Sequence, residues 1–137
     1  MNDKKQTESA IINLFRKHFP GFPKGSLKPS ESPDFILGIS PKHNIGIELT
    51  SLHLFFSDTN LLSYENITAC LDAKNEKLRL YRQKKLNEYW LIIYVEDKHS
   101  WHRINIHNKL MVWDFKTGFT RVFLFNSSEG KVLELNH

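Results

Sequence analysis

Two short stretches, SPDFIL at Ser32–Leu37 and IGIELT at Ile45–Thr50, decide the fold expected for this chain. In the second stretch the three large aliphatic side chains alternate with other residues, so they share one face of a strand and Glu48 lies on the other. The intervening Ser40–Asn44 has the composition of a turn that folds one strand back on the other. We therefore predict a β-hairpin in which Asp34, at the head of one strand, approaches Glu48 on its partner.

Two carboxylates that are brought together repel each other. Such a pair usually needs a cation, a shared proton or a basic neighbour. Our working hypothesis is a divalent-metal site at Asp34 and Glu48.

The composition is that of one soluble domain spanning residues 1–137. Forty per cent hydrophobic content, with ten Phe and three Trp, indicates a packed core. The single cysteine, Cys70, excludes an internal disulfide framework and fits a reducing cytosol, so we expect a cytoplasmic protein. The polar N-terminus lacks an apolar signal core and no run approaches a membrane span, so no membrane association is expected. A net charge of +4 is compatible with a polyanionic partner, although many proteins of similar charge bind no nucleic acid.

The first helix is predicted from about Asp3 to about His18. Glu8 lies within its apolar stripe, which consists of Ile11, Ile12, Phe15 and Phe19. A carboxylate on the buried side of a helix is costly unless a partner compensates it. The alternative is that Glu8, one turn from the helix start, is favoured by the helix dipole and still reached by solvent.

A longer helix is predicted from about Ser63 to Asn87. Its apolar stripe consists of Ile67, Cys70, Leu71, Leu78 and Tyr81. Lys74 interrupts this stripe, whereas Lys77 falls near its edge, at about 100° of rotation per residue. Either the Lys74 side chain extends past the core into solvent, or its amine reaches the carboxylates of the hairpin.

Tyr89–Val95 is a nearly continuous apolar and aromatic run, typical of a strand that is buried on both faces. A strand, a helix and a second strand in succession form a βαβ unit, so this strand is expected to lie parallel to Ile45–Thr50. Two further strands are predicted at Phe119–Phe125 and Lys131–Leu135.

Basic residues in two segments are candidates for contacts with nucleic acid. Lys24 and Lys28 lie in a connector rich in Pro, Gly and Ser, where they suit a phosphate backbone or simply face solvent. In the segment after the buried strand, His99, Trp101 and Arg103 interleave basic and aromatic side chains that can contact phosphates and stack on bases. The histidines of this segment have a spacing that matches no closed zinc site.

The order of these elements resembles the PD-(D/E)xK nuclease superfamily. The shared features are a helix with an inward Glu, Pro-Asp at a strand, Gly-Ile-Glu-Leu-Thr on its partner, a helix with an inward Lys and a buried strand. The resemblance covers roughly Thr7 to Val95 and implies an α/β, restriction-endonuclease-like fold. That fold has an α-β-β-β-α-β core with a mixed central sheet flanked by helices. Residues 96–137 would then be a β-rich C-terminal elaboration.

The resemblance also implies roles for individual residues. Asp34 matches the motif aspartate and Glu48 the second acid, both of which are metal ligands in the family. Glu8 matches an acid often found on the first helix, which helps to hold metal or water. The Leu49 backbone carbonyl would complete a site for Mg²⁺ or Mn²⁺.

Thr50 stands where the family's motif has a lysine. In some members the lysine is displaced onto the following helix, which Lys74 fits, with Lys77 as second choice. Lys74 would orient the attacking water or offset charge on the phosphate. Thr50 can hydrogen-bond that water or a carboxylate, or it can be a well-packed strand residue.

The function implied is that of a metal-dependent nuclease that hydrolyses phosphodiester bonds, with DNA as the expected substrate. Small nucleases of this kind are often dimers or parts of larger assemblies. The missing motif lysine also motivates an alternative, a catalytically degenerate nuclease-like fold that binds nucleic acid or protein. A third reading is an unrelated α/β protein in which Glu8 and Lys74 are surface residues at helix edges.

Overall fold

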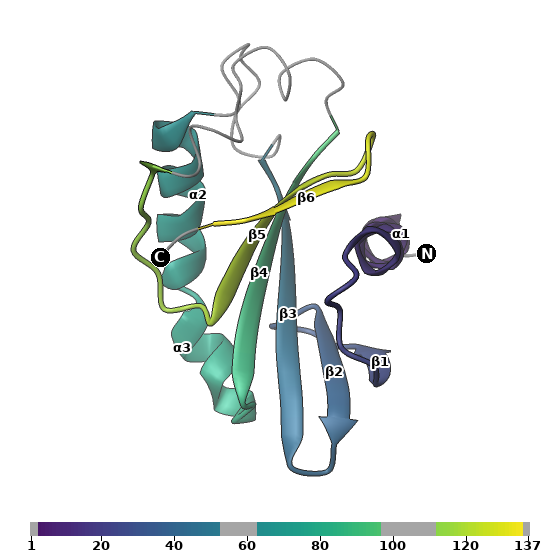
Figure 1. Cartoon of the computed structure of the whole chain (residues 1–137). Helices are drawn as coiled ribbons and strands as arrows, with labels where there is room; N and C mark the ends of the chain where they lie inside the picture. Colours follow the sequence, from purple (N-terminus) through teal and green to yellow (C-terminus); the bar gives the residue numbers. More distant parts are fainter. Residues whose placement is uncertain (1–2, 53–62, 97–111, 136–137) are drawn as a thin grey trace.

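A six-stranded mixed sheet with the order β1-β2-β3-β4-β5-β6 forms the centre of the computed structural model, which describes residues 3–52, 63–96 and 112–135 (Figure 1). The strands are β1 (Ser26–Pro29), β2 (Phe35–Ser40), β3 (His43–Ser51), β4 (Glu88–Val95), β5 (Arg121–Asn126) and β6 (Lys131–Glu134). The helices are α1 (Asp3–His18), α2 (Tyr64–Asn75), α3 (Leu78–Tyr81) and a 3₁₀ turn, η2 (Arg82–Lys84). The chain is therefore an α/β protein, as expected.

The pairing of the strands confirms the predicted hairpin and the predicted parallel strand. β2 pairs antiparallel with β3, with Phe35 opposite Ile47, and β1 adds antiparallel to the outer side of β2. β4 lies parallel to β3, with Trp90 opposite Ile47. The two C-terminal strands are also present, because β5 joins β4 in parallel and β6 returns antiparallel to β5.

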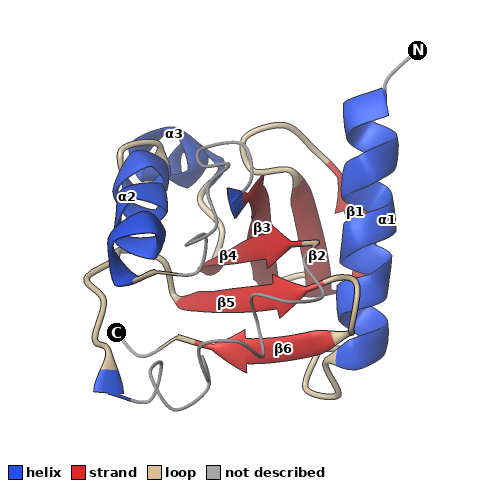
Figure 2. Cartoon of the chain, turned by 90° about the horizontal axis from the view of Figure 1, so that it is seen from above, coloured by secondary structure: helices blue, strands red, loops and turns tan. Residues whose placement is uncertain are grey.

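Helices cover both faces of the sheet, with α1 on one side and α2 and α3 on the other (Figures 1 and 2). The period of two along each strand sends alternate side chains into the two layers of core. The layer under α1 includes Ile12, Phe15, Ile45, Ile47, Trp90, Ile92 and Phe123. The layer under α2 and α3 includes Ile67, Leu71, Leu91, Ile93, Val95 and Leu124.

The first helix has the bounds that its periodicity predicts, Asp3–His18. The prediction of one continuous helix from Ser63 to Asn87 is wrong, since α2 ends at Asn75 and α3 begins at Leu78. The side chain of Asn75 binds the segment before β5, where Asn75 Oδ1 accepts from Thr117 Oγ1 at 2.8 Å and from the Gly118 amide at 3.1 Å. An Asn that bonds outside its helix favours the helix end over continuation.

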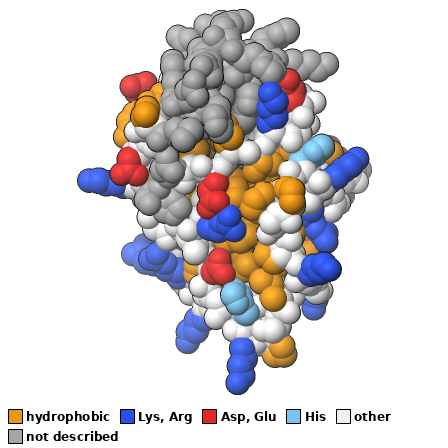
Figure 3. Space-filling view, viewed as in Figure 1, with side chains coloured by type: hydrophobic (Ala, Val, Ile, Leu, Met, Phe, Trp, Pro, Cys, Tyr) orange, Lys and Arg blue, Asp and Glu red, His pale blue; other side chains and the backbone are white. Residues whose placement is uncertain are grey.

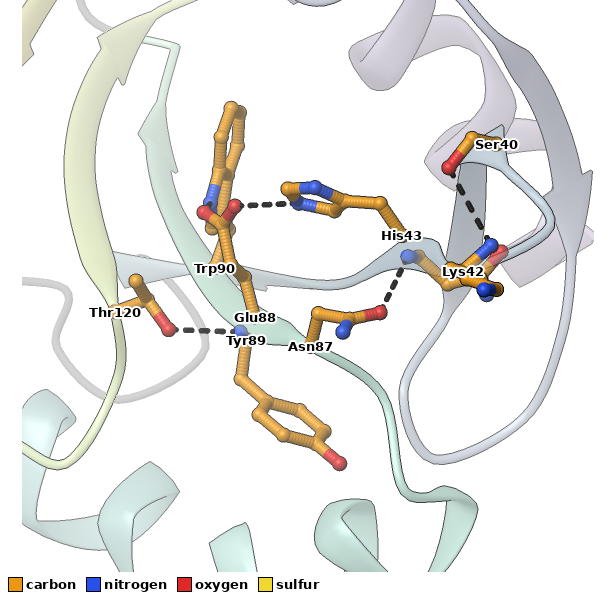
Figure 4. A network of polar contacts seen from close by, with 9 residues as sticks. Ser40, Lys42, His43, Asn87, Glu88, Tyr89, Trp90 and Thr120 are labelled. Carbon is orange, nitrogen blue, oxygen red and sulfur yellow. Dashed lines mark hydrogen bonds and ion pairs between the residues drawn. The ribbon is translucent and has the colours of Figure 1, made fainter.

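Polar contacts hold the turn of the hairpin to the beginning of β4 (Figure 4). The Asn44 amide donates to Asn87 Oδ1 at 2.7 Å, and the Asn87 amide donates back to the Asn44 carbonyl at 2.9 Å. His43 Nε2 lies 2.8 Å from Glu88 Oε2, and Trp90 Nε1 donates to the other oxygen of Glu88 at 2.9 Å. These contacts set the register of β3 against β4 from the end at which both strands begin.

Within the described ranges, no helix combines the length and apolar character needed to span a membrane.

In the space-filling view, Lys and Arg side chains are dispersed around an apolar area rather than gathered in one track (Figure 3).

We expect Gly46→Ala to destabilise the protein by about 2 kcal/mol, as overpacking of a tight site usually does. A Cβ at this position would lie 2.8 Å from Pro33 Cγ and 2.7 Å from Leu86 Cδ1. Gly46 therefore allows the segment before β2 and the segment before β4 to close over the hairpin. Urea unfolding followed by circular dichroism measures the change.

The control is Gly38→Ala in the same hairpin, where the nearest atom to a new Cβ is Asn44 Oδ1 at 3.3 Å. Its loss of stability should be clearly smaller. Equal losses for the two variants would contradict the packing explanation.

Candidate functional site

Asp34 and Glu48 meet at the point where β2 stops covering the edge of β3. The last pair of the hairpin is Phe35 with Ile47, so β3 continues from Glu48 to Ser51 without β2 beside it. The Asp34 carboxylate occupies this edge, with Oδ2 accepting from the Leu49 amide at 2.9 Å. The Asp34 amide in turn donates to Glu48 Oε1 at 3.2 Å. The convergence that the hairpin predicts is therefore present.

Leu49 presents its backbone to the same edge. The amide and carbonyl of one strand residue point toward the same neighbouring strand. Because the Leu49 amide reaches Asp34, its carbonyl also faces the side of β3 on which Asp34 lies. The backbone oxygen proposed as a third ligand is thus directed toward the carboxylates.

Glu48 points into the layer under α2 and α3, where only 6% of the residue is exposed. Its Oε2 accepts from Lys74 Nζ at 2.9 Å and from the Tyr81 hydroxyl at 2.8 Å. The Lys74 side chain is 13% exposed, so it ends in this ion pair and does not extend into solvent. Of the two candidate lysines, Lys74 reaches Glu48, whereas Lys77 is exposed at the start of α3.

Tyr81 is a site residue that the sequence analysis missed. It was assigned to the apolar stripe, and its ring does pack in that core layer. Its hydroxyl reaches the same Glu48 oxygen as Lys74, although the two side chains come from different helices, α3 and α2. A buried tyrosine hydroxyl needs a partner, and that requirement was the available signal.

Glu8 approaches the site from the opposite face of the sheet, on α1, and is 5% exposed. Its Oε1 is buried and accepts no hydrogen bond from any residue that the structure describes. Lys5 Nζ, at 3.5 Å, forms an ion pair with this oxygen. Lys5, also missed from sequence, further donates to the carbonyls of Ser30 and Asp34 and so holds α1 against the start of β2.

Burial dominates the electrostatics of the site. Desolvation raises the pKa of Asp34; the Leu49 hydrogen bond opposes this change, and the neighbouring Glu8 adds to it. Burial and repulsion from Asp34 likewise raise the pKa of Glu48, although Lys74 and Tyr81 favour its charged form. The cluster therefore gains from any bound proton or cation.

The oxygen donors at this edge fit a hard divalent cation better than a soft metal. The unsatisfied Glu8 Oε1 and the raised pKa values of the other two acids point the same way. Across residues 3–52, 63–96 and 112–135, however, no group of three or more His, Cys, Asp or Glu side chains is arranged to hold a metal ion. Fewer than three of these side chains therefore share one ligand position, and other oxygens, such as the Leu49 carbonyl, would have to contribute.

Thr50 is buried, with 3% of the residue exposed, and its side chain hydrogen-bonds to Cys70 on α2.

Lys24 and Lys28 are exposed, the first beside a pocket of about 390 Å³ that Arg16, Lys17 and Phe22 also line. His99, Trp101 and Arg103 lie outside the described residues.

We expect Lys74→Met to destabilise the protein by about 3 kcal/mol at pH 7, because it leaves the buried Glu48 carboxylate without its ion-pair partner. Adding Glu48→Gln should recover most of that loss, since the neutral amide needs no counter-charge. Urea unfolding of the two single variants and the double variant measures the coupling.

Lys77→Met serves as the matched control and should change the free energy of unfolding by less than about 0.5 kcal/mol. Additive effects of the two site substitutions would show that the ion pair contributes nothing.

We expect Asp34→Asn to be more stable than the wild type at pH 7, in EDTA. A raised folded-state pKa means that the native protein binds more protons than the unfolded chain between the ordinary value, 3.8, and the folded value. Stability of the wild type is therefore lost as pH rises through that window. The asparagine side chain of the variant keeps an acceptor for the Leu49 amide and cannot ionise.

The stability difference between Asp34→Asn and the wild type should shrink as the pH falls toward about 4, where the wild-type carboxyl is increasingly protonated in both states. Urea titrations at several pH values measure it. A difference that does not change with pH would argue against strain from the buried charge.

Comparisons with protein-family models, with curated proteins and with solved structures found no match for this chain. The family resemblance therefore rests on the residues themselves and on the order of the elements that carry them. A functional assignment has to come from the contacts at the open edge of β3.

Proposed function

We propose that this protein is a metal-dependent nuclease with a restriction-endonuclease-like core, acting on phosphodiester bonds and most directly on DNA. The observation that carries the proposal is the largely buried contact of 2.9 Å between Lys74 Nζ and Glu48 Oε2, beside Asp34 at the end of β3 that β2 leaves unpaired. A lysine brought by a helix to the Glu48 carboxylate, next to Asp34, would supply the charge that Thr50 cannot.

The topology supports this assignment. The element order α1-β1-β2-β3-α2-β4, with the short α3 and η2 between α2 and β4, parallels the α-β-β-β-α-β order of the superfamily core. The first three strands form an antiparallel meander and β4 joins β3 in parallel. β5 and β6 extend the same sheet beyond this core.

Asp34, Glu48 and the Leu49 carbonyl are the groups that would bind Mg²⁺ or Mn²⁺, with Glu8 beside Asp34 to help hold the metal or a water. The bound cation would polarise the scissile phosphate and lower the pKa of a coordinated water. The hydrogen bond from the Asp34 amide to Glu48 Oε1 is long at 3.2 Å. Oε1 is therefore the Glu48 oxygen that could most easily give up its present partner for a cation. Tyr81 and Lys74 hold Oε2 and so fix the orientation of the carboxylate.

Lys74 lies where a positive charge can act on the reaction. Its ammonium group is largely desolvated, so its electrostatic effect on a nearby phosphate is stronger than in water. An ammonium held in place before the substrate arrives needs no reorganisation when charge develops on the phosphate.

A second candidate is the non-cleaving form of the same fold, used to bind nucleic acid or protein. Two observations favour it. Both oxygens of Glu48 already accept hydrogen bonds from the protein, and the Thr50 hydroxyl bonds to Cys70 rather than to the carboxylates.

We expect the purified protein to cleave plasmid or single-stranded DNA in Mg²⁺ or Mn²⁺ and to be inactive in EDTA. Asp34→Asn and Glu48→Gln should abolish cleavage, because each removes an anionic ligand. Lys74→Met should slow cleavage by about 100-fold or more, the usual cost of losing a preorganised electrostatic contact. Gel electrophoresis of time courses measures the rates.

Lys77→Met should keep the cleavage rate of the wild type to within about twofold, as expected for an exposed side chain that supplies no group to the site. Activity that survives Asp34→Asn and Glu48→Gln would identify a contaminant and overturn the proposal. Binding of DNA without cleavage under every metal condition would establish the second candidate instead.

A further inference from the structure

Two pockets share Glu8 and Lys4 in their linings. One has a volume of about 250 Å³ and is lined by Lys5, Ser30, Ser32 and Asp34 among others. The other has a volume of about 430 Å³ and lies between α1 and the ends of β3 and β4. The site is therefore a pair of adjoining compartments, one of them beside the carboxylate cluster.

The smaller compartment has polar walls, which include two lysines, Lys4 and Lys5, and three acids, Glu8, Glu31 and Asp34. Lys5 is already engaged by Glu8 and by backbone carbonyls. Lys4 is exposed and forms no ion pair with any other residue in the described ranges. An ammonium group that borders both compartments suits a phosphate that passes between them.

The larger compartment is mainly apolar and carries an aromatic side chain. Tyr94 of β4, Leu49 of β3 and Thr7 of α1 contribute to its walls. Its volume falls within the range of roughly 300–1,000 Å³ typical of sites for small molecules. Burial raises the pKa of Tyr94, as do the nearby carboxylates of Glu96, Glu8 and Asp34, so its hydroxyl stays protonated at neutral pH.

A base inside a duplex is paired and stacked, so it reaches a pocket of this kind only after extrusion from the helix, at a cost of a few kcal/mol. A single strand has no pairing to break and can insert a base directly. Stacking on an aromatic wall stabilises the inserted base by about 1–3 kcal/mol, whichever base it is.

We infer that the substrate is a single strand, or the frayed end of a duplex, with one base inserted beside Tyr94 while its neighbouring phosphate lies at the carboxylates. This inference rests on the proposed function, because the larger compartment would bind a base of the substrate only if the phosphodiester bond is cleaved at the adjoining carboxylates. Lys4 contacts the backbone between the two compartments. Tyr94 acts as a substrate-binding residue and takes no part in the proton transfers.

The test measures binding by fluorescence anisotropy in Ca²⁺ at one fixed salt concentration. The probes are a short oligothymidylate, an abasic oligomer of the same length and charge, and a duplex. The wild type should bind oligothymidylate about tenfold more tightly than the abasic oligomer, the loss that one stacking contact predicts. Equal affinity for these two single strands would overturn the inference, and this comparison needs no variant.

Tyr94→Leu should lose the preference for bases over abasic sites, whereas Tyr94→Phe, which keeps the ring, should retain it within about twofold. Neither variant should change duplex affinity. A general loss of affinity for all three probes would point to a damaged fold and not to a base pocket, and would count against the inference.

Cleavage in Mg²⁺ separates the two proposals. Base-dependent binding that requires Tyr94, in a protein that cleaves nothing, would overturn the nuclease and leave the base pocket standing. Cleavage that is equally fast on single strands and duplexes, and unchanged in Tyr94→Leu, would overturn the base pocket and leave the nuclease standing.

Discussion

The carboxylate of Glu48, buried between β3 and the helices beside it, is the constraint on which much of this structure depends. A charge in that position is expensive unless hydrogen bonds compensate it. Its partners come from separate elements, with Lys74 on α2 and Tyr81 on α3. The rotation and position of both helices over the sheet are therefore tied to one strand residue.

Asp34 connects the two faces of the sheet, because it contacts an acid on each of them. Through its backbone it contacts Glu48, which belongs to the layer under α2. Through its carboxylate it neighbours Glu8, which belongs to α1 on the other side. Asp34 therefore contacts Glu48 and neighbours Glu8 from the stretch of β3 that β2 leaves unpaired beyond Phe35. A longer β2 would form more backbone hydrogen bonds with β3, but it would cover the edge at which Asp34 binds the Leu49 amide.

Local patterns were enough to predict much of the fold. Alternation gave the hairpin and its facing acids, and the apolar run of β4 implied a strand parallel to β3. The interruption of an apolar stripe was enough to single out Lys74 and Glu8. Both residues prove to be buried in ion pairs, which removes the reading that they lie on helix surfaces.

Other features depended on contacts between distant segments and left no local signal. The break after Asn75 follows from hydrogen bonds to Thr117 and Gly118, which periodicity within the helix does not report. The hydrogen bond from the Tyr81 hydroxyl to Glu48 was not predicted, because the ring of Tyr81 fits the apolar stripe without it. The two apolar stripes also do not report that Glu8 and Lys74 reach the hairpin from opposite faces of the sheet, which follows from the packing of α1 and α2 on different sides (Figures 1 and 2).

The outermost strands carry a consequence for how copies of this chain can associate. β1 and β6 each have four residues, and each contains a lysine, while β1 also ends in Pro29. Short, charged or proline-bearing margins are poor templates for another strand. Lateral growth of the sheet from one molecule into the next is thereby discouraged, which favours helices or loops over a continuous intermolecular sheet as the contact in a dimer.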